Sequence, residues 1–226
     1  MPTSSLKSQN QRALLAAISL NAGAFAALLG VNVLLSSGLA LNLPALLKSV
    51  ASAGATLLLC GVVNHQLNPV TKARLVFWRW RDPLPGTEAF SKLGPGDPRI
   101  TMSIIAARLG PLPTAPAQQN AAWYRLYRQV ADEPAIEEAH KAFLLYRDYA
   151  SLAFLCLVAM SPLALWLARP IGTAATYAVA LLAQYLLVRN AAADRGRRLV
   201  CNVLAAYMDN TTPATASATS AEANPG

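Results

Sequence analysis

Charged side chains are scarce in this chain. Asp, Glu, Lys and Arg make up 13% of its 226 residues, while hydrophobic residues make up 54%. Soluble domains contain about 25% charged residues on average. The mean hydropathy is correspondingly positive, at +0.35. This composition argues against an ordinary soluble domain and predicts a membrane protein.

Cysteine and histidine are also rare. The three cysteines, Cys60, Cys156 and Cys201, are far apart and odd in number, which argues against a disulfide framework and predicts ordinary buried thiols. The two histidines, His65 and His140, have no carboxylates or thiols at metal-ligand spacing. The chain also lacks a G-x-S-x-G motif, a Cys beside a His, and a phosphate-binding loop. We therefore expect no metal, no cofactor and no catalytic residue.

Long apolar runs are what the chain does contain. Each of the four is about long enough to cross a hydrocarbon core of roughly 30 Å as a helix. They cover residues 13–35, 43–64, 149–168 and 171–188. The predicted fold is an all-α membrane protein whose four transmembrane helices form two hairpins, 13–64 and 149–188, with a helical cytoplasmic region, 65–148, between spans 2 and 3. The first run also resembles a signal peptide, but its length favours an uncleaved anchor.

The distribution of basic residues predicts the orientation of these spans. Of the 19 Lys and Arg residues, 17 lie in the N-terminal arm 1–12, in residues 65–148 and after residue 188. Only Lys48 and Arg169 belong to the opposite side. By the positive-inside rule, both termini are cytoplasmic in a bacterial inner membrane. Topology thereby accounts for much of the net charge of +8, so nucleic acid is an unlikely partner.

The cytoplasmic parts show several helix signals. Residues 97–110 predict a short helix capped by Asp97, and the hydrophobic spacing around Trp123 predicts an amphipathic helix over 117–132. Residues 134–168 have no breaker before Pro162 and predict a single long helix. Residues 189–209 predict a basic amphipathic helix, and the polar tail 210–226 is expected to be disordered.

Tryptophan and arginine gather where the chain leaves the membrane. Trp78 and Trp80 follow the second span, and Arg195, Arg197 and Arg198 follow the fourth. Tryptophans favour the headgroup zone, and arginines are attracted to anionic lipid headgroups. We expect these five residues to lie at the membrane surface, with the lipid bilayer as their partner.

One polar constellation remains as a candidate ligand site. Arginines and aromatic rings together can bind a phosphate or stack on a nucleotide base. The set consists of Arg79, Arg81, Asp82, Gln119, Asn120, Trp123, Tyr124, Arg125 and Arg128. Two interpretations stay open: amphipathic packing with headgroup contact, which is favoured, or a site for a small anionic ligand.

Small and polar residues within the spans predict helix contacts. Ser19, Gly23 and Ala27 recur every four residues, a spacing that lets helices approach closely. Packing within one four-helix bundle is the favoured explanation, and self-association between copies is the alternative. Asn21, Asn32 and Gln184 are expected to face other helices, because an unpaired amide is costly in hydrocarbon. The spans contain no Asp or Glu, which argues against a proton-coupled transporter.

These features predict a polytopic inner-membrane protein with a cytoplasmic interaction or sensing module, acting as a non-enzymatic accessory or signalling component that binds a protein partner or itself. The alternative is a pore-forming or membrane-disrupting effector, for example in phage defence, triggered by a nucleotide or protein signal. A second alternative is a membrane-embedded enzyme that uses His65, His140 or Asp82 as its acid or base.

Overall fold

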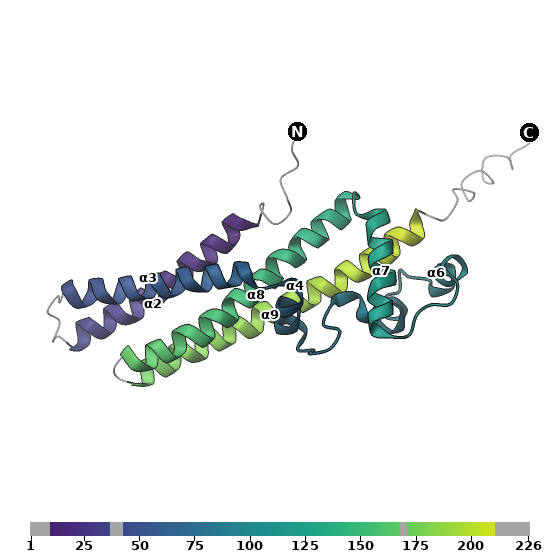
Figure 1. Ribbon diagram of the computed structural model, residues 1–226. Helices are drawn as coiled ribbons and strands as arrows, with labels where there is room; N and C mark the ends of the chain where they lie inside the picture. Colours follow the sequence, from purple (N-terminus) through teal and green to yellow (C-terminus); the bar gives the residue numbers. More distant parts are fainter. Residues whose placement is uncertain (1–9, 37–42, 168–170, 211–226) are drawn as a thin grey trace, which may run out of the picture. The chain divides into compact units, whose positions relative to one another are not determined.

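The computed structural model describes residues 10–36, 43–167 and 171–210, and all regular structure in these ranges is helical (Figure 1). The long helices are α2 (Gln11–Ser36), α3 (Leu43–Gln66), α8 (Pro134–Leu167) and α9 (Ile171–Asp209). The shorter ones are α4 (Pro69–Phe77), η1 (Pro85–Glu88), η2 (Ala89–Leu93), α5 (Gly94–Gly96), α6 (Met102–Leu109) and α7 (Pro116–Val130). The predicted all-helical class is therefore confirmed for the described residues.

The chain forms two compact units. The long-helix unit comprises the described residues of 1–84 and 138–196, and the short-helix unit comprises those of 85–137 and 197–210. Residues 65–84 and 138–148, which the sequence assigned to the cytoplasmic region, belong to the long-helix unit. Helices α8 and α9 each contain residues of both units.

Three helices, α2, α8 and α9, are long and apolar enough to cross a membrane. A fourth candidate is the end of α3, Val50–Gln66, together with α4 beyond a bend of 107°. The side chain of Asn68 makes this bend by accepting a hydrogen bond from the Thr71 amide at 2.7 Å, and Pro69 starts the new helix. The described residues thus contain three to four helices of membrane-spanning length, in agreement with the predicted apolar runs.

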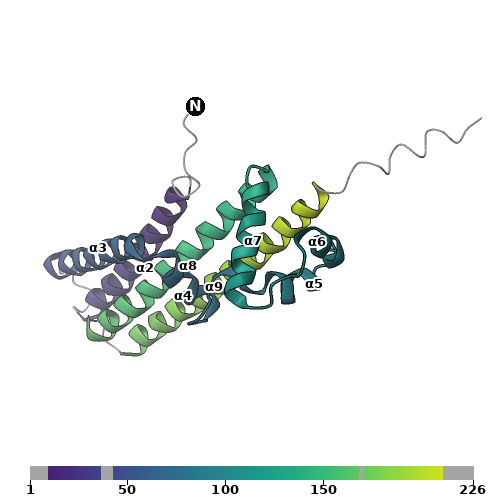
Figure 2. The same cartoon turned by 45° about the vertical axis from the view of Figure 1, so that its right-hand side comes forward.

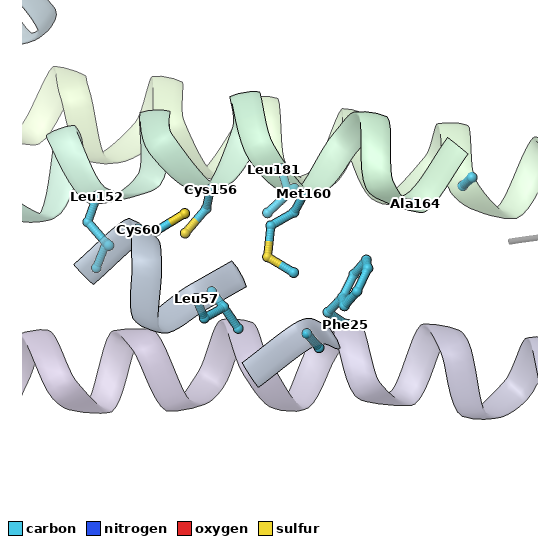
Figure 3. Close-up of a cluster of buried hydrophobic side chains, with 10 residues drawn as sticks. Phe25, Leu57, Cys60, Leu152, Cys156, Met160, Ala164 and Leu181 are labelled. Atoms are coloured by element: carbon cyan, nitrogen blue, oxygen red, sulfur yellow. The ribbon is translucent and has the colours of Figure 1, made fainter. Parts of the chain in front are cut away.

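A single hydrophobic core joins all four long helices. In Figure 3, Phe25 of α2 and Leu57 of α3 lie on one side of this core, and Leu152 and Met160 of α8 lie on the other. Its remaining buried members are Ala53, Cys60, Cys156, Ala164, Ala174 and Leu181. The apolar runs therefore pack against one another inside one unit.

The outer surface of this unit is apolar as well. Leu58 is 70% exposed, Leu187 is 71% exposed and Trp166 is 77% exposed. Most large exposed hydrophobic side chains of the described chain belong to this unit. Helices that are hydrophobic all round fit a lipid environment, because lipid tails do not penalise exposed apolar surface.

Small residues allow close packing where α4 and α9 meet α8. Val76, Ala150, Ala192 and Ala193 form a second buried cluster there. A side chain added at Gly196 would approach the rings of Phe77 and Phe143 to 2.8 and 2.9 Å. Glycine therefore permits α9 to contact both rings.

The short-helix unit has its own core around the end of α9 (Figure 2). A Cβ atom added at Gly94 would lie 3.3 Å from the side chain of Leu204 in α9. The Thr101 amide donates to the sulfur of Met208 at 3.4 Å. The apolar face of residues 199–207 is thus buried within this unit, with Leu199, Val203 and Leu204 at 2% exposure or less.

The sequence predicted helices over residues 97–110, 117–132 and 134–168. The helices over 117–132 and 134–168 are confirmed as α7 and α8, which runs through Pro162 to Leu167. The helix over 97–110 is wrong at its start, because α6 begins at Met102 after Thr101. The carboxylate of Asp97 binds Arg99, so it does not cap that helix.

The sequence also predicted a separate helix over residues 189–209, an N-terminal arm, a first loop and a polar tail. Residues 189–209 form no separate element, since α9 is continuous from Ile171 to Asp209. The first nine residues of the N-terminal arm, most of the first loop at 37–42, and the tail from residue 211 lie outside the described residues.

Candidate functional site

The segment that follows α4 is fixed by Trp78. This residue adopts a left-handed conformation, with φ of 54°, and its amide closes the helix on the Arg74 carbonyl. Its indole Nε1 donates to the Tyr185 hydroxyl at 2.9 Å, which itself donates to the Leu75 carbonyl at 2.9 Å. The Arg189 guanidinium lies 4.2 Å from the centre of the indole ring. Trp78 thereby connects α4 to α9.

The other predicted residues of this segment lie nearby in the sequence. Trp80 is 83% exposed, and its carbonyl accepts from the Arg74 side chain at 3.2 Å. Arg81 and Asp82 are exposed, and Arg79 is half-buried. Asp82 has a positive φ of 46°, a conformation that aspartate tolerates better than most residues.

Of the other predicted surface arginines, Arg195 lies 5.6 Å from the Tyr146 ring in the long-helix unit. Arg197 and Arg198 are exposed in the short-helix unit. Aromatic contacts therefore position Arg195 as well as Arg189.

The predicted ligand residues of α7 divide into buried and exposed groups. Gln119 is 1% exposed, and its oxygen accepts from the amides of Phe90 and Ser91 at 3.0 and 3.2 Å. Its nitrogen donates to the Thr114 carbonyl at 2.8 Å, so the side chain fixes the local fold. Trp123 is also buried, and Asn120 faces Gly86. Tyr124, Arg125 and Arg128 are exposed.

The nine predicted ligand residues belong to two different units. Arg79, Arg81 and Asp82 lie in the long-helix unit, and the six residues from Gln119 to Arg128 lie in the short-helix unit.

A cavity of about 350 Å³ lies on the short-helix unit, and we call it the arginine cavity. It forms between the end of α6, the proline linker and α7, where Gly110 has a positive φ of 76°. The lining consists of Arg108, Leu109, Pro111, Pro113, Ala122, Arg125, Leu126 and Gln129. Two guanidinium groups and an amide above an apolar floor suit an anionic partner with an apolar part.

Sequence reasoning found only one of the polar residues of this cavity, Arg125. It missed Arg108 and Gln129, because Arg108 belongs to a separate helix on the other side of the proline linker. Arg125 and Gln129 are one helical turn apart, and that spacing is the signal that could have identified the second residue.

The long-helix unit contains a buried polar cluster that the sequence did not reveal. Lys72 Nζ lies 3.1 Å from Asp148 Oδ1, and Arg147 Nη2 lies 2.9 Å from the same oxygen. Asn64 donates to the Asp148 carbonyl at 3.2 Å, and the Ser151 hydroxyl donates to the Asn64 side-chain oxygen. We call these five residues the Asp148 cluster. It joins α4 to α8 through the buried carboxylate of Asp148, and α3 to α8 through the backbone carbonyl of Asp148 and the Ser151 hydroxyl.

The surroundings of Asp97 and His140 shift the pKa values of these two groups. The Arg99 guanidinium hydrogen-bonds to Asp97 at 2.7 Å and lowers the pKa of that carboxyl to about 2. Burial lowers the pKa of His140, and the nearby charge of Arg147 adds to this effect. His65 is exposed, and the described part of the chain holds no group of three or more His, Cys, Asp or Glu side chains able to bind a metal.

No family model, curated protein or solved structure matches this chain.

The Asp148 cluster predicts an asymmetry between two substitutions. Asp148→Asn leaves Lys72 buried beside a neutral amide, which should reduce the free energy of unfolding by about 3–5 kcal/mol. Lys72→Met should reduce the free energy of unfolding by less, because Asp148 keeps its contact with Arg147. Thermal unfolding of the detergent-purified variants measures both effects.

The matched control is Asp82→Asn, because Asp82 is exposed. This variant should unfold at the same temperature as the wild type. The double variant with Lys72→Met and Asp148→Asn should lose less free energy of unfolding than the sum of the two single losses. Equal stability of Asp148→Asn and wild type would contradict a stabilising role for the cluster.

Proposed function

We propose that this protein is a multi-pass component of a bacterial inner membrane, with four membrane helices arranged as two hairpins. The observation that carries this proposal is the long-helix unit, which is apolar both in its core and on much of its outer surface. Such a surface is stable in lipid and would aggregate in water. The basic residues support cytoplasmic termini, since 17 of 19 lie on the predicted inner side.

Reporter fusions test this topology. An alkaline phosphatase joined after Leu41 should be active, because that loop is proposed to face the periplasm. The same enzyme joined after Pro111 should be inactive, while a fluorescent protein joined there should fold and fluoresce. Activity of the phosphatase at both positions would rule out the four-span arrangement.

We further propose that the short-helix unit is a cytoplasmic interaction module, and that the protein is a non-enzymatic accessory or signalling component. The arginine cavity supports this role, because it offers Arg108, Arg125 and Gln129 above an apolar floor. An acidic segment of a partner protein, with an apolar side chain beside its carboxylates, complements this lining. Helices α8 and α9 contain residues of both units, so they are the elements able to link binding to the membrane helices.

Photocrosslinking tests the role of the cavity. A benzophenone amino acid in place of Gln129 should give a discrete crosslinked product in intact cells, because this position lines the cavity. Charge reversal by Arg108→Glu and Arg125→Glu should reduce the yield at least tenfold. The matched control is Arg128→Glu, an exposed arginine of the same helix that does not line the cavity. A product that survives the double reversal would contradict the proposed binding mode.

A second candidate function is supported by the outer face of α2. Ser19, Gly23 and Ala27 are exposed, and a side chain added at Gly23 would meet no atom within 4 Å. The expected packing of this row inside the bundle is therefore wrong, whereas Ala53 of α3 does pack inside. An outward row of small residues fits self-association between copies, which a pore-forming or membrane-disrupting effector needs.

Overexpression distinguishes the effector from the accessory component. An effector should depolarise the membrane, and Gly23→Leu should abolish this effect by blocking close helix approach. Ala51→Leu, at an exposed position of α3, is the matched control and should leave it unchanged. An unchanged membrane potential on overexpression of the wild type would argue against the effector.

A further inference from the structure

We propose that Cys60, Cys156 and Met160 form a binding site for monovalent copper within the core of the long-helix unit. This inference goes beyond the proposed interaction module and does not depend on it. The long spacing between Cys60 and Cys156 in the sequence gave no sign of a shared site. The fold brings the two residues together because α3 and α8 pack in one core.

The three sulfur atoms lie on one side of α8. Figure 3 shows the side chains of Cys60 and Cys156 pointing toward each other, with the Met160 side chain further along the same core, toward Phe25. The thiols of Cys60 and Cys156 are both buried in this core. Met160 follows Cys156 by four residues, so the two side chains leave the same face of the helix one turn apart.

The surroundings of these sulfur atoms are dry and apolar. Cys156 and Met160 are 0% exposed, and Cys60 is 4% exposed. Leu57, Leu152 and Phe25 contribute to the same core. Such a shell excludes bulk water, and the two thiols and the thioether are the soft donors that it contains.

This donor set selects among metals. Thiolate and thioether ligands are soft and favour Cu(I), whereas Mg²⁺ and Ca²⁺ require oxygen. Structural zinc sites need four ligands drawn from cysteine, histidine and carboxylate, and this site has only two such residues. Cu(I) is stable with two or three sulfur ligands, a number that Cys60, Cys156 and Met160 supply.

Binding changes the charge of the site. Two thiols and one Cu⁺ ion give a copper bis-thiolate of charge −1 and release two protons, while Met160 coordinates without losing a proton. A negative charge in an apolar core requires compensation. Lys72 and Arg147 are cationic side chains of the same unit and would supply part of it.

The Asp148 cluster and the two cysteines lie on the same two helices, α3 and α8. Asn64 of the Asp148 cluster is one helical turn from Cys60 along α3. Asp148 is eight residues, about 12 Å, from Cys156 along α8.

Competition for Cu(I) tests the site. The full-length protein, purified in detergent and kept reduced without oxygen, is titrated with Cu(I) buffered by a chromophoric chelator. We expect about one ion per chain in the wild type. Cys60→Ser and Cys156→Ser should each lower the affinity at least 100-fold, and Met160→Leu about tenfold. Cys201→Ser is the matched control, because Cys201 is buried in the short-helix unit, and it should bind like the wild type.

A measurement on the wild type makes the result independent of variant folding. X-ray absorption of the copper-loaded protein should show a first shell of sulfur alone, with two or three atoms. Nitrogen or oxygen in that shell would overturn the proposal. Full binding by a Cys60→Ser, Cys156→Ser double variant would also overturn it, as would equal loss in Cys201→Ser.

Discussion

The carboxylate of Asp148 is the contact on which the long-helix unit depends. It lies against Lys72 of α4 and Arg147 of its own helix, while the backbone carbonyl of the same residue accepts from Asn64 of α3. Three helices thus converge on one residue at 3% exposure. Removing a charge from water is costly, so the arrangement is stable only while its partners stay in place. The bend between α3 and α4 is thus held by the contacts of Asp148 with Asn64 and Lys72 as well as by the cap at Asn68.

Several polar side chains within the apolar helices find hydrogen-bond partners, and they do so in two ways. Asn21, Thr56 and Thr176 donate to the backbone carbonyl four residues earlier in their own helices. Gln184 instead donates to the Tyr149 hydroxyl of α8, as the sequence predicted. An unpaired group in hydrocarbon costs several kcal/mol, and both solutions avoid that cost. A short side chain can therefore be polar in this unit without binding another helix.

Periodicity and length predicted the long helices well, because hydrophobic runs and proline breaks act locally. The positions of α7 and α8 followed from such signals. Contacts between distant residues could not be predicted in the same way. Cys60 and Cys156 looked unrelated in the sequence, and Lys72 looked like one more basic residue of the cytoplasmic side. The start of α6 was misplaced because Asp97 had a nearer partner, Arg99, than the helix amides.

Gly196 determines how α9 is oriented about its own axis. The two phenyl rings of Phe77 and Phe143 lie where any other residue would carry a side chain. Its neighbours in the chain are Arg195 and Arg197, and successive residues of a helix are about 100° apart. Turning α9 by a single residue would press an arginine into the two rings. The absence of one side chain therefore fixes which face of a 39-residue helix meets each of its neighbours in the long-helix unit.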